Sequence, residues 1–187
     1  MNEKCLGQAR MIRYADDFVI VCRPGRGREV LERTTRWLRA KGLELNEGKT
    51  RLVDICREGI NFLGFNLTWR KSLKGRRYLH VEPNQKSRQN LRKHLARILN
   101  HWTRWKATGE VVREANQVMR GWAGYFHYRN STSVMNVMKN YSRERLRRWI
   151  WRKHGCKRGL WTFTTARLHT HYGLYALPTT AVWKANR

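Results

Sequence analysis

The second half of the chain repeats apolar residues at the spacing of an amphipathic helix. This spacing places such residues on one face, and a helix with such a face must bury it against a partner. Neighbouring segments carry the same pattern, so they can cover one another. One apolar stripe contains Leu91, Leu95, Ile98, Leu99 and Trp102. The pattern predicts helices over residues 85–105, 110–128 and 134–153.

The first half differs, because short β-prone runs alternate with turn residues. Residues 9–14 and 18–22 are two such runs, and the three residues between them predict a hairpin turn. Apolar residues at helical spacing follow over residues 26–41, and Gly42 is suited to end that helix. The chain is therefore predicted to have an α+β fold. Three further strands are predicted over residues 51–56, 60–68 and 77–81.

Charge and tryptophan are distributed unevenly along the chain. Its 187 residues include 40 Lys and Arg against 13 Asp and Glu, which gives a net charge of +27. Residues 1–82 hold +8 of this charge, whereas residues 83–187 hold +19 and seven of the nine Trp. This shift predicts two domains, 1–82 and 83–187, that meet near Pro83. The excess of positive charge predicts a polyanionic partner, which charge alone does not identify.

Hydrophobic segments long enough for a membrane are not found in this sequence. No apolar run approaches the roughly 20 residues that span a bilayer, and residues 1–10 contain no apolar signal segment. We therefore expect a cytoplasmic protein of bacterial type without a membrane partner. An organellar location stays open.

Asp16 and Asp17 form an adjacent acidic pair in the predicted hairpin turn. Two neighbouring carboxylates repel each other, which costs free energy unless a cation offsets the repulsion. A nearby Lys or Arg could supply that cation in so basic a chain. Alternatively, Mg²⁺ prefers carboxylate oxygens, and two such ions can hold the reacting oxygens of a phosphoryl transfer. The pair on its own leaves both interpretations open.

Several sequence blocks occur in an order and spacing that resemble one enzyme family. The YADD run at residues 14–17 resembles the catalytic hairpin of reverse transcriptases. Alanine at the second position of the motif, with Arg13 before it, resembles the form found in proteins of group II introns. The resemblance implies the C-terminal part of a group II intron reverse transcriptase/maturase, with the end of the palm, the thumb and the maturase domain X. The other matching blocks are GLELN at 42–46 followed by KT at 49–50, FLGF at 62–65, and the maturase-like residues 116–126 and 146–149.

The resemblance implies roles for residues of the palm. Asp16 and Asp17 match its metal-binding pair, so Mg²⁺ is the expected cofactor if the site is complete. Tyr14 would lie beside the primer terminus. Lys49 matches a lysine near the departing pyrophosphate, where a cation stabilises developing charge, although a solvated surface role stays open. The expected primer grip consists of Phe62, Leu63, Gly64 and Phe65, with Gly64 allowing close backbone approach.

Basic and aromatic residues of the helical half indicate an RNA-binding surface. Lys and Arg can contact phosphates, and aromatic rings can stack on unpaired bases. The alternative is a solvated basic face, and each individual Trp is expected in the core because large aromatics dominate burial. Gly121 and Gly124 beside Trp122 are expected to allow close helix packing. The predicted RNA-binding residues are Lys86, Arg88, Arg92, Lys93, Arg97, Arg104, Arg147, Arg148, Arg152 and Lys153.

The family palm also requires a third metal-binding aspartate on an earlier strand, and only 13 residues precede Tyr14. The isolated chain is therefore expected not to polymerise DNA. Our first hypothesis is an RNA-binding part of a maturase that assists the folding and splicing of group II intron RNA. The second is a polymerase half that acts on a DNA primer or target once an upstream fragment supplies the fingers and the third aspartate. The third is a remnant that binds RNA without specificity.

Overall fold

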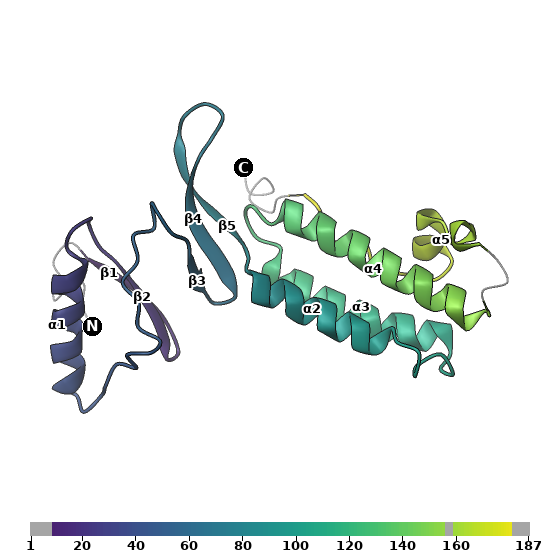
Figure 1. The fold of residues 1–187 in the computed structure, drawn as a ribbon, viewed down its shortest axis with the longest axis horizontal. Helices are drawn as coiled ribbons and strands as arrows, with labels where there is room; N and C mark the ends of the chain where they lie inside the picture. The colour runs from purple at the N-terminus through teal and green to yellow at the C-terminus, as the bar shows by residue number, and fades with distance from the viewer. Residues whose placement is uncertain (1–8, 156–158, 181–187) are drawn as a thin grey trace. The chain divides into compact units, whose positions relative to one another are not determined.

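The computed structural model describes residues 9–155 and 159–180 of the chain. These residues form small antiparallel sheets and α-helices, which confirms the predicted α+β class (Figure 1). The chain divides into two compact units, residues 1–63 and 64–187. The change in charge and tryptophan content of the sequence lies near Pro83 instead, within the second unit.

The first unit contains the predicted hairpin and one helix. Strands β1 (Arg10–Tyr14) and β2 (Asp17–Val21) pair antiparallel, and α1 spans Gly27–Arg39. Gly42 has a φ of +69°, as expected for a residue that ends a helix. The buried core that the described residues of this unit form is small. It consists of Ala9 and Val30, with Met11, Ile20 and Cys22 packed against them.

Residues 51–56 do not form a strand, so that prediction is wrong. Asp54 organises a turn instead: its backbone oxygen accepts the N–H groups of Arg57 and Glu58, each at 2.9 Å. The Asp54 carboxylate also accepts the N–H of Cys56 at 3.0 Å. Aspartate competes for backbone donors in this way, and this local bonding overrides the apolar pattern of the segment.

A second sheet has the strand order β3–β4–β5, with β3 at Ile60–Phe62, β4 at Phe65–Lys71 and β5 at Arg77–Pro83. The single strand predicted over residues 60–68 is therefore wrong, because a two-residue turn divides it. Leu63 and Gly64 have φ values of +49° and +80°, and positive φ at both positions is typical of a tight hairpin turn. The strand predicted over residues 77–81 is confirmed.

Helices form most of the rest of the second unit where the structure describes it, as predicted. Helices α2, α3 and α4 run alongside one another, and α5 packs against α4 (Figure 1). The side chain of Asn84 caps α2 by accepting the N–H of Ser87 at 2.9 Å. The helix bounds are Gln85–Ile98 (α2), Thr108–Phe126 (α3), Thr132–Lys153 (α4) and Thr165–Thr170 (α5), with a 3-10 helix at Leu160–Thr162.

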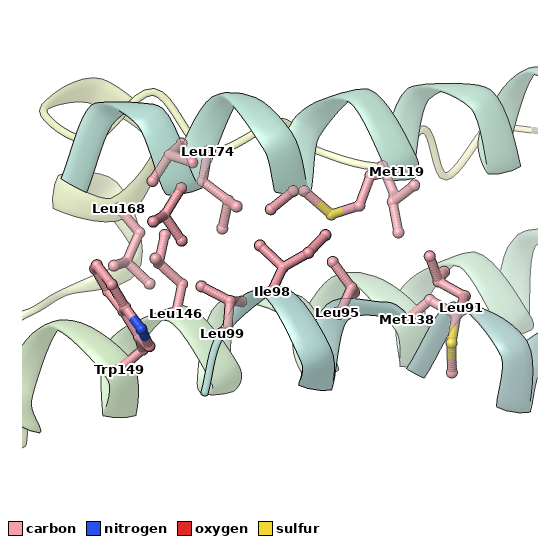
Figure 2. Close-up of a cluster of buried hydrophobic side chains, with 14 of the residues drawn as sticks. Leu91, Leu95, Ile98, Leu99, Met119, Met138, Leu146, Trp149, Leu168 and Leu174 are labelled. Atoms are coloured by element: carbon pink, nitrogen blue, oxygen red, sulfur yellow. The ribbon is translucent and has the colours of Figure 1, made fainter. Parts of the chain in front are cut away.

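Apolar side chains of α2, α3 and α4 point into one shared interior (Figure 2). Leu95, Met119 and Leu146 are fully buried there. Burial of each such side chain contributes about 1.5–3 kcal/mol, so this interior stabilises the bundle. Two expectations are wrong. Trp102 was expected on the buried apolar stripe but is 74% exposed, because α2 ends at Ile98. Gly121 and Gly124 were expected to allow close helix packing, but a Cβ on either residue would meet no atom within 4 Å.

Polar contacts close one end of the bundle. The Arg145 guanidinium donates to the backbone oxygens of Ala96 and Leu99, at 3.1 and 2.8 Å, and so satisfies the last carbonyls of α2. Trp149 Nε1 donates to the Asn100 oxygen at 2.9 Å. Lys153 Nζ donates to the backbone of the α2–α3 connection, including Lys106 at 2.6 Å. These contacts fix the basic end of α4 against that connection.

Candidate acidic turn and nucleic-acid interface

The acidic pair lies at the tip of the β1–β2 hairpin, as the sequence predicts. Asp16 is in the turn, and Asp17 begins β2 directly opposite Tyr14. Ala15 has a φ of +50°, an unfavourable conformation for a residue with a Cβ. Arg13 Nε donates to the Ala15 oxygen at 2.8 Å and helps to hold this turn. The hairpin therefore projects both carboxylates from one tight bend.

Both carboxylates of the turn are available to a ligand. Asp16, Asp17 and Tyr14 are all exposed, Tyr14 to 65%. Within residues 9–155 and 159–180, neither carboxylate forms an ion pair, so the neutralising Lys or Arg considered above is not present there. Two carboxylates suit Mg²⁺ by donor type. The described residues contain no group of three His, Cys, Asp or Glu side chains that could complete a metal site.

Lys49 lies in an exposed turn after α1. Its backbone N–H donates to the oxygen of Asn46 at 3.1 Å and to the Asn46 side chain at 3.2 Å. The Thr50 hydroxyl bonds to the same backbone oxygen at 2.8 Å. Local hydrogen bonds thus shape the segment and leave the Lys49 side chain in solvent. Its role beside pyrophosphate stays a prediction.

The expected primer grip contains a glycine with a structural role of its own. A Cβ on Gly64 would lie 3.0 Å from the Phe126 ring and from Ser87 Oγ, closer than ordinary contacts. The Gly64 oxygen accepts the Asn84 N–H at 2.9 Å and the Ser87 hydroxyl at 3.0 Å. Phe65 packs beside Phe126, with ring centroids 5.2 Å apart. Gly64 therefore ties β4 to the start of α2, while Phe62 and Leu63 are half-buried.

One face of α2 presents cations to solvent. The helix contains no acidic residue; Lys86, Lys93 and Arg97 share this face, and Arg92 is exposed to one side of it. None of these four forms an ion pair with the described part of the chain. Arg92 also lies over the ring of Tyr141, 5.6 Å from its centroid. This surface is the strongest candidate for phosphate contact among the predicted residues.

The predicted basic residues of α4 and its surroundings divide into two groups. Arg148 and Arg152 are exposed. Arg88, Arg147 and Lys153 instead make internal contacts: Arg88 pairs with Glu82 at 2.8 Å, and Arg147 Nε donates to the Phe163 oxygen at 2.8 Å. Arg104 is half-buried and donates to a neighbouring backbone oxygen. The side chains of these four residues make contacts within the protein, which the sequence spacing of basic residues does not indicate.

The general expectation of buried tryptophans is wrong at several positions. Trp149 is 3% exposed and belongs to the core, but Trp102, Trp105 and Trp161 are 74, 81 and 80% exposed. Trp102 and Trp105 lie in the α2–α3 connection, which Lys153 contacts through its ammonium group. Exposed rings beside Lys and Arg are suited to stacking on unpaired bases.

Two family comparisons cover most of the chain. A reverse transcriptase (RNA-dependent DNA polymerase) profile matches residues 1–67, and a group II intron maturase-specific domain profile matches residues 88–167. Both matches follow the order expected from the sequence blocks. The chain belongs to the group II intron reverse transcriptase/maturase family. No curated protein matches the chain significantly.

Each part of the site now falls within a family region. The reverse transcriptase match contains the acidic turn, Lys49 and the expected primer grip, and the maturase-specific match contains most of α2 and all of α3 and α4. No described helix is apolar over a length that could cross a bilayer.

Sequence reasoning missed a basic cluster between the two family matches. Residues 59–81 contain no acidic residue, which is the signal that could have identified it. The cluster lies at the tip of the β4–β5 hairpin. It consists of Arg70, Lys71, Lys74, Arg76 and Arg77.

Proposed function

We propose that this maturase-family chain binds group II intron RNA and stabilises the folded form that splices. The observation that carries the proposal is the exposed cationic face of α2 within the maturase-specific region, free of ion pairs among the described residues. When unpaired surface cations neutralise phosphates, the counterions condensed on the nucleic acid are released, which favours binding to a polyanion.

The chemistry of splicing can stay with the RNA in this proposal. Lys93, Arg97 and their neighbours contact phosphates, and the exposed Trp102 and Trp105 stack on unpaired bases. A protein that binds folded RNA more tightly than unfolded RNA shifts the population toward the folded form. No side chain of the chain needs to transfer a proton or a phosphoryl group.

Binding specificity tests this function. The full chain is titrated with intron RNA from its own genomic locus and with an unrelated structured RNA of equal length, at one fixed salt concentration. We expect clearly tighter binding of the intron RNA. Equal affinities would contradict the proposal and identify a remnant that binds RNA without specificity.

A second function is favoured by the acidic turn. Asp16 and Asp17 are exposed and lack ion pairs in the described ranges, so they are free to bind Mg²⁺. With an upstream fragment that supplies the fingers and the third aspartate, the chain would complete a polymerase acting on a DNA primer. Bound Mg²⁺ would supply charge stabilisation for phosphoryl transfer. The isolated chain is proposed to be inactive.

Complementation tests this second function. The chain is mixed with such a fragment, primer, template and Mg²⁺, and DNA synthesis is measured. Restored synthesis that Asp16→Ala abolishes and Glu32→Ala, at an exposed position of α1, retains supports the proposal. Absence of synthesis in the mixture argues against it, and synthesis by the chain alone contradicts the proposed inactivity.

A further inference from the structure

The β4–β5 hairpin carries an exposed basic tip. All five cations of the tip cluster are exposed, and none forms an ion pair with another described residue. Leu73, at the end of the loop, is also completely exposed. The tip therefore offers positive charge and one apolar side chain to solvent with no internal partner.

The loop that carries this charge is well defined by its own hydrogen bonds. The Ser72 N–H donates to the Arg76 oxygen at 2.8 Å, and the Gly75 N–H donates to the Ser72 oxygen at 2.9 Å. Ser72 Oγ accepts the Arg76 N–H at 3.1 Å, and Gly75 adopts a φ of +76°. The cations therefore lie on a hydrogen-bonded turn and on the two paired strands that lead into it.

The charges of the ribbon repel one another and lie on both of its faces. Lys71 is directly opposite Arg77 across the strands, and like charges in that position are destabilising. Arg70 precedes Lys71, so its side chain projects from the opposite face. Trp69 lies on the same face as Lys71 and is 42% exposed. Phosphates on both sides of the ribbon would relieve this repulsion.

We propose that the tip of the β4–β5 hairpin is an RNA-binding arm that lies between two phosphate-bearing segments of folded RNA. The inference rests on the proposed RNA-binding function and adds a second contact region outside the maturase-specific match. Lys71 and Arg77 neutralise phosphates on one face, and Arg70 neutralises phosphates on the other. Leu73 is placed to contact the RNA surface at the end of the arm.

Salt dependence of intron RNA binding tests the arm in the full chain. The triple variant Arg70→Gln, Lys71→Gln, Arg77→Gln should lower the slope of log affinity against log salt by about 3, one per lost phosphate contact. The matched control is Arg28→Gln, Arg36→Gln, Arg39→Gln, which removes the same charge from exposed positions of α1. Equal slope changes in the two triple variants would overturn the proposal.

A charge reversal separates binding from folding. Lys71→Glu places a carboxylate opposite Arg77, so the melting midpoint of the free chain should stay the same or rise while RNA binding weakens several-fold. Single-stranded RNA of the same length should show a smaller slope change than folded RNA in the triple variant. Unchanged binding by Lys71→Glu, or equal changes with single-stranded and folded RNA, would contradict the arm.

The outcomes also separate this inference from the proposed function. If the chain prefers intron RNA but the arm variants bind like the parent, the arm is wrong and the function stands. If the arm variants lose slope but the chain shows no preference for intron RNA, the arm binds RNA and the maturase function is wrong.

Discussion

Glu82 at the end of β5 is a half-buried carboxylate that lies between Arg88 and His80. Its oxygens lie 2.8 Å from Arg88 Nη2 and 3.3 Å from His80 Nε2, the latter without the alignment of a hydrogen bond. Burial by itself would raise the pKa of Glu82, but the adjacent His80 and Arg88 together hold that pKa below its ordinary value of 4.5. The ionised form therefore stabilises the fold.

The lowered pKa of Glu82 gives a pH-dependent stability. Its contribution should be complete above about pH 4.5 and should be lost as the pH falls below that value toward the folded-state pKa. Urea unfolding midpoints of the parent chain and Glu82→Gln, measured from pH 6 to pH 3, should differ at pH 6 and converge in acid. A difference that does not change with pH would contradict this account.

Arg145 and Arg148 show how similar residues of one helix can have different roles. Arg145→Met removes the donor to the Ala96 and Leu99 carbonyls, so we expect a loss of about 1–3 kcal/mol in the free energy of unfolding. The control Arg148→Met changes an exposed side chain and should alter that free energy by less than about 0.5 kcal/mol. Equal losses, measured by denaturant unfolding, would show that Arg145 does not act as a helix cap.

At the scale of an element, most basic side chains of α2 should contact RNA, whereas its apolar side chains pack in the core. Lys93→Ala or Arg97→Ala should each lower the salt slope of RNA binding by about 1, because each removes one phosphate contact. Unfolding should be unaffected, since both side chains are exposed. A slope equal to that of the parent would show that this face is only solvated.

Long periodic elements could be predicted from the sequence, and short ones only in part. The helices of the second unit repeat apolar residues over many turns, so α3 and α4 were predictable within two residues, and α2 at its start but not at its end, which comes seven residues before residue 105. The segment around Asp54 and the turn at Leu63 and Gly64 depend on single side-chain or backbone choices. Local hydrogen bonds and backbone turns of this kind interrupt a strand that the apolar pattern predicts, and the spacing of apolar residues does not indicate them.

At the scale of the whole chain, the two units differ in the size of their buried cores. Among the described residues, the first unit buries a few apolar side chains against α1, whereas the second buries a large interior among its helices. Backbone amides of β1 and β2 should therefore exchange hydrogen faster than those of α2 and α3. Slower exchange in the first unit, measured by mass spectrometry on the full chain, would contradict this order.

The candidate site was predictable where it depends on motif and order. The acidic turn follows from two β-prone runs around Asp16 and Asp17, and the structure places it there. The division of arginines between surface and internal contacts was not predictable, because Arg88 and Arg147 bond to residues distant in the sequence. The exposed Trp102 and Trp105 follow from the early end of α2, which the periodicity did not mark.

The central claim is that the chain stabilises folded intron RNA through the basic surface of its second unit. It is tested most directly by splicing of the intron RNA from its own locus, at a magnesium concentration too low for the RNA alone. We expect the chain to raise the spliced fraction, and the Lys93→Ala, Arg97→Ala double variant to raise it less than an Arg36→Ala control does. No increase with the parent chain, despite intact folding, would contradict the account.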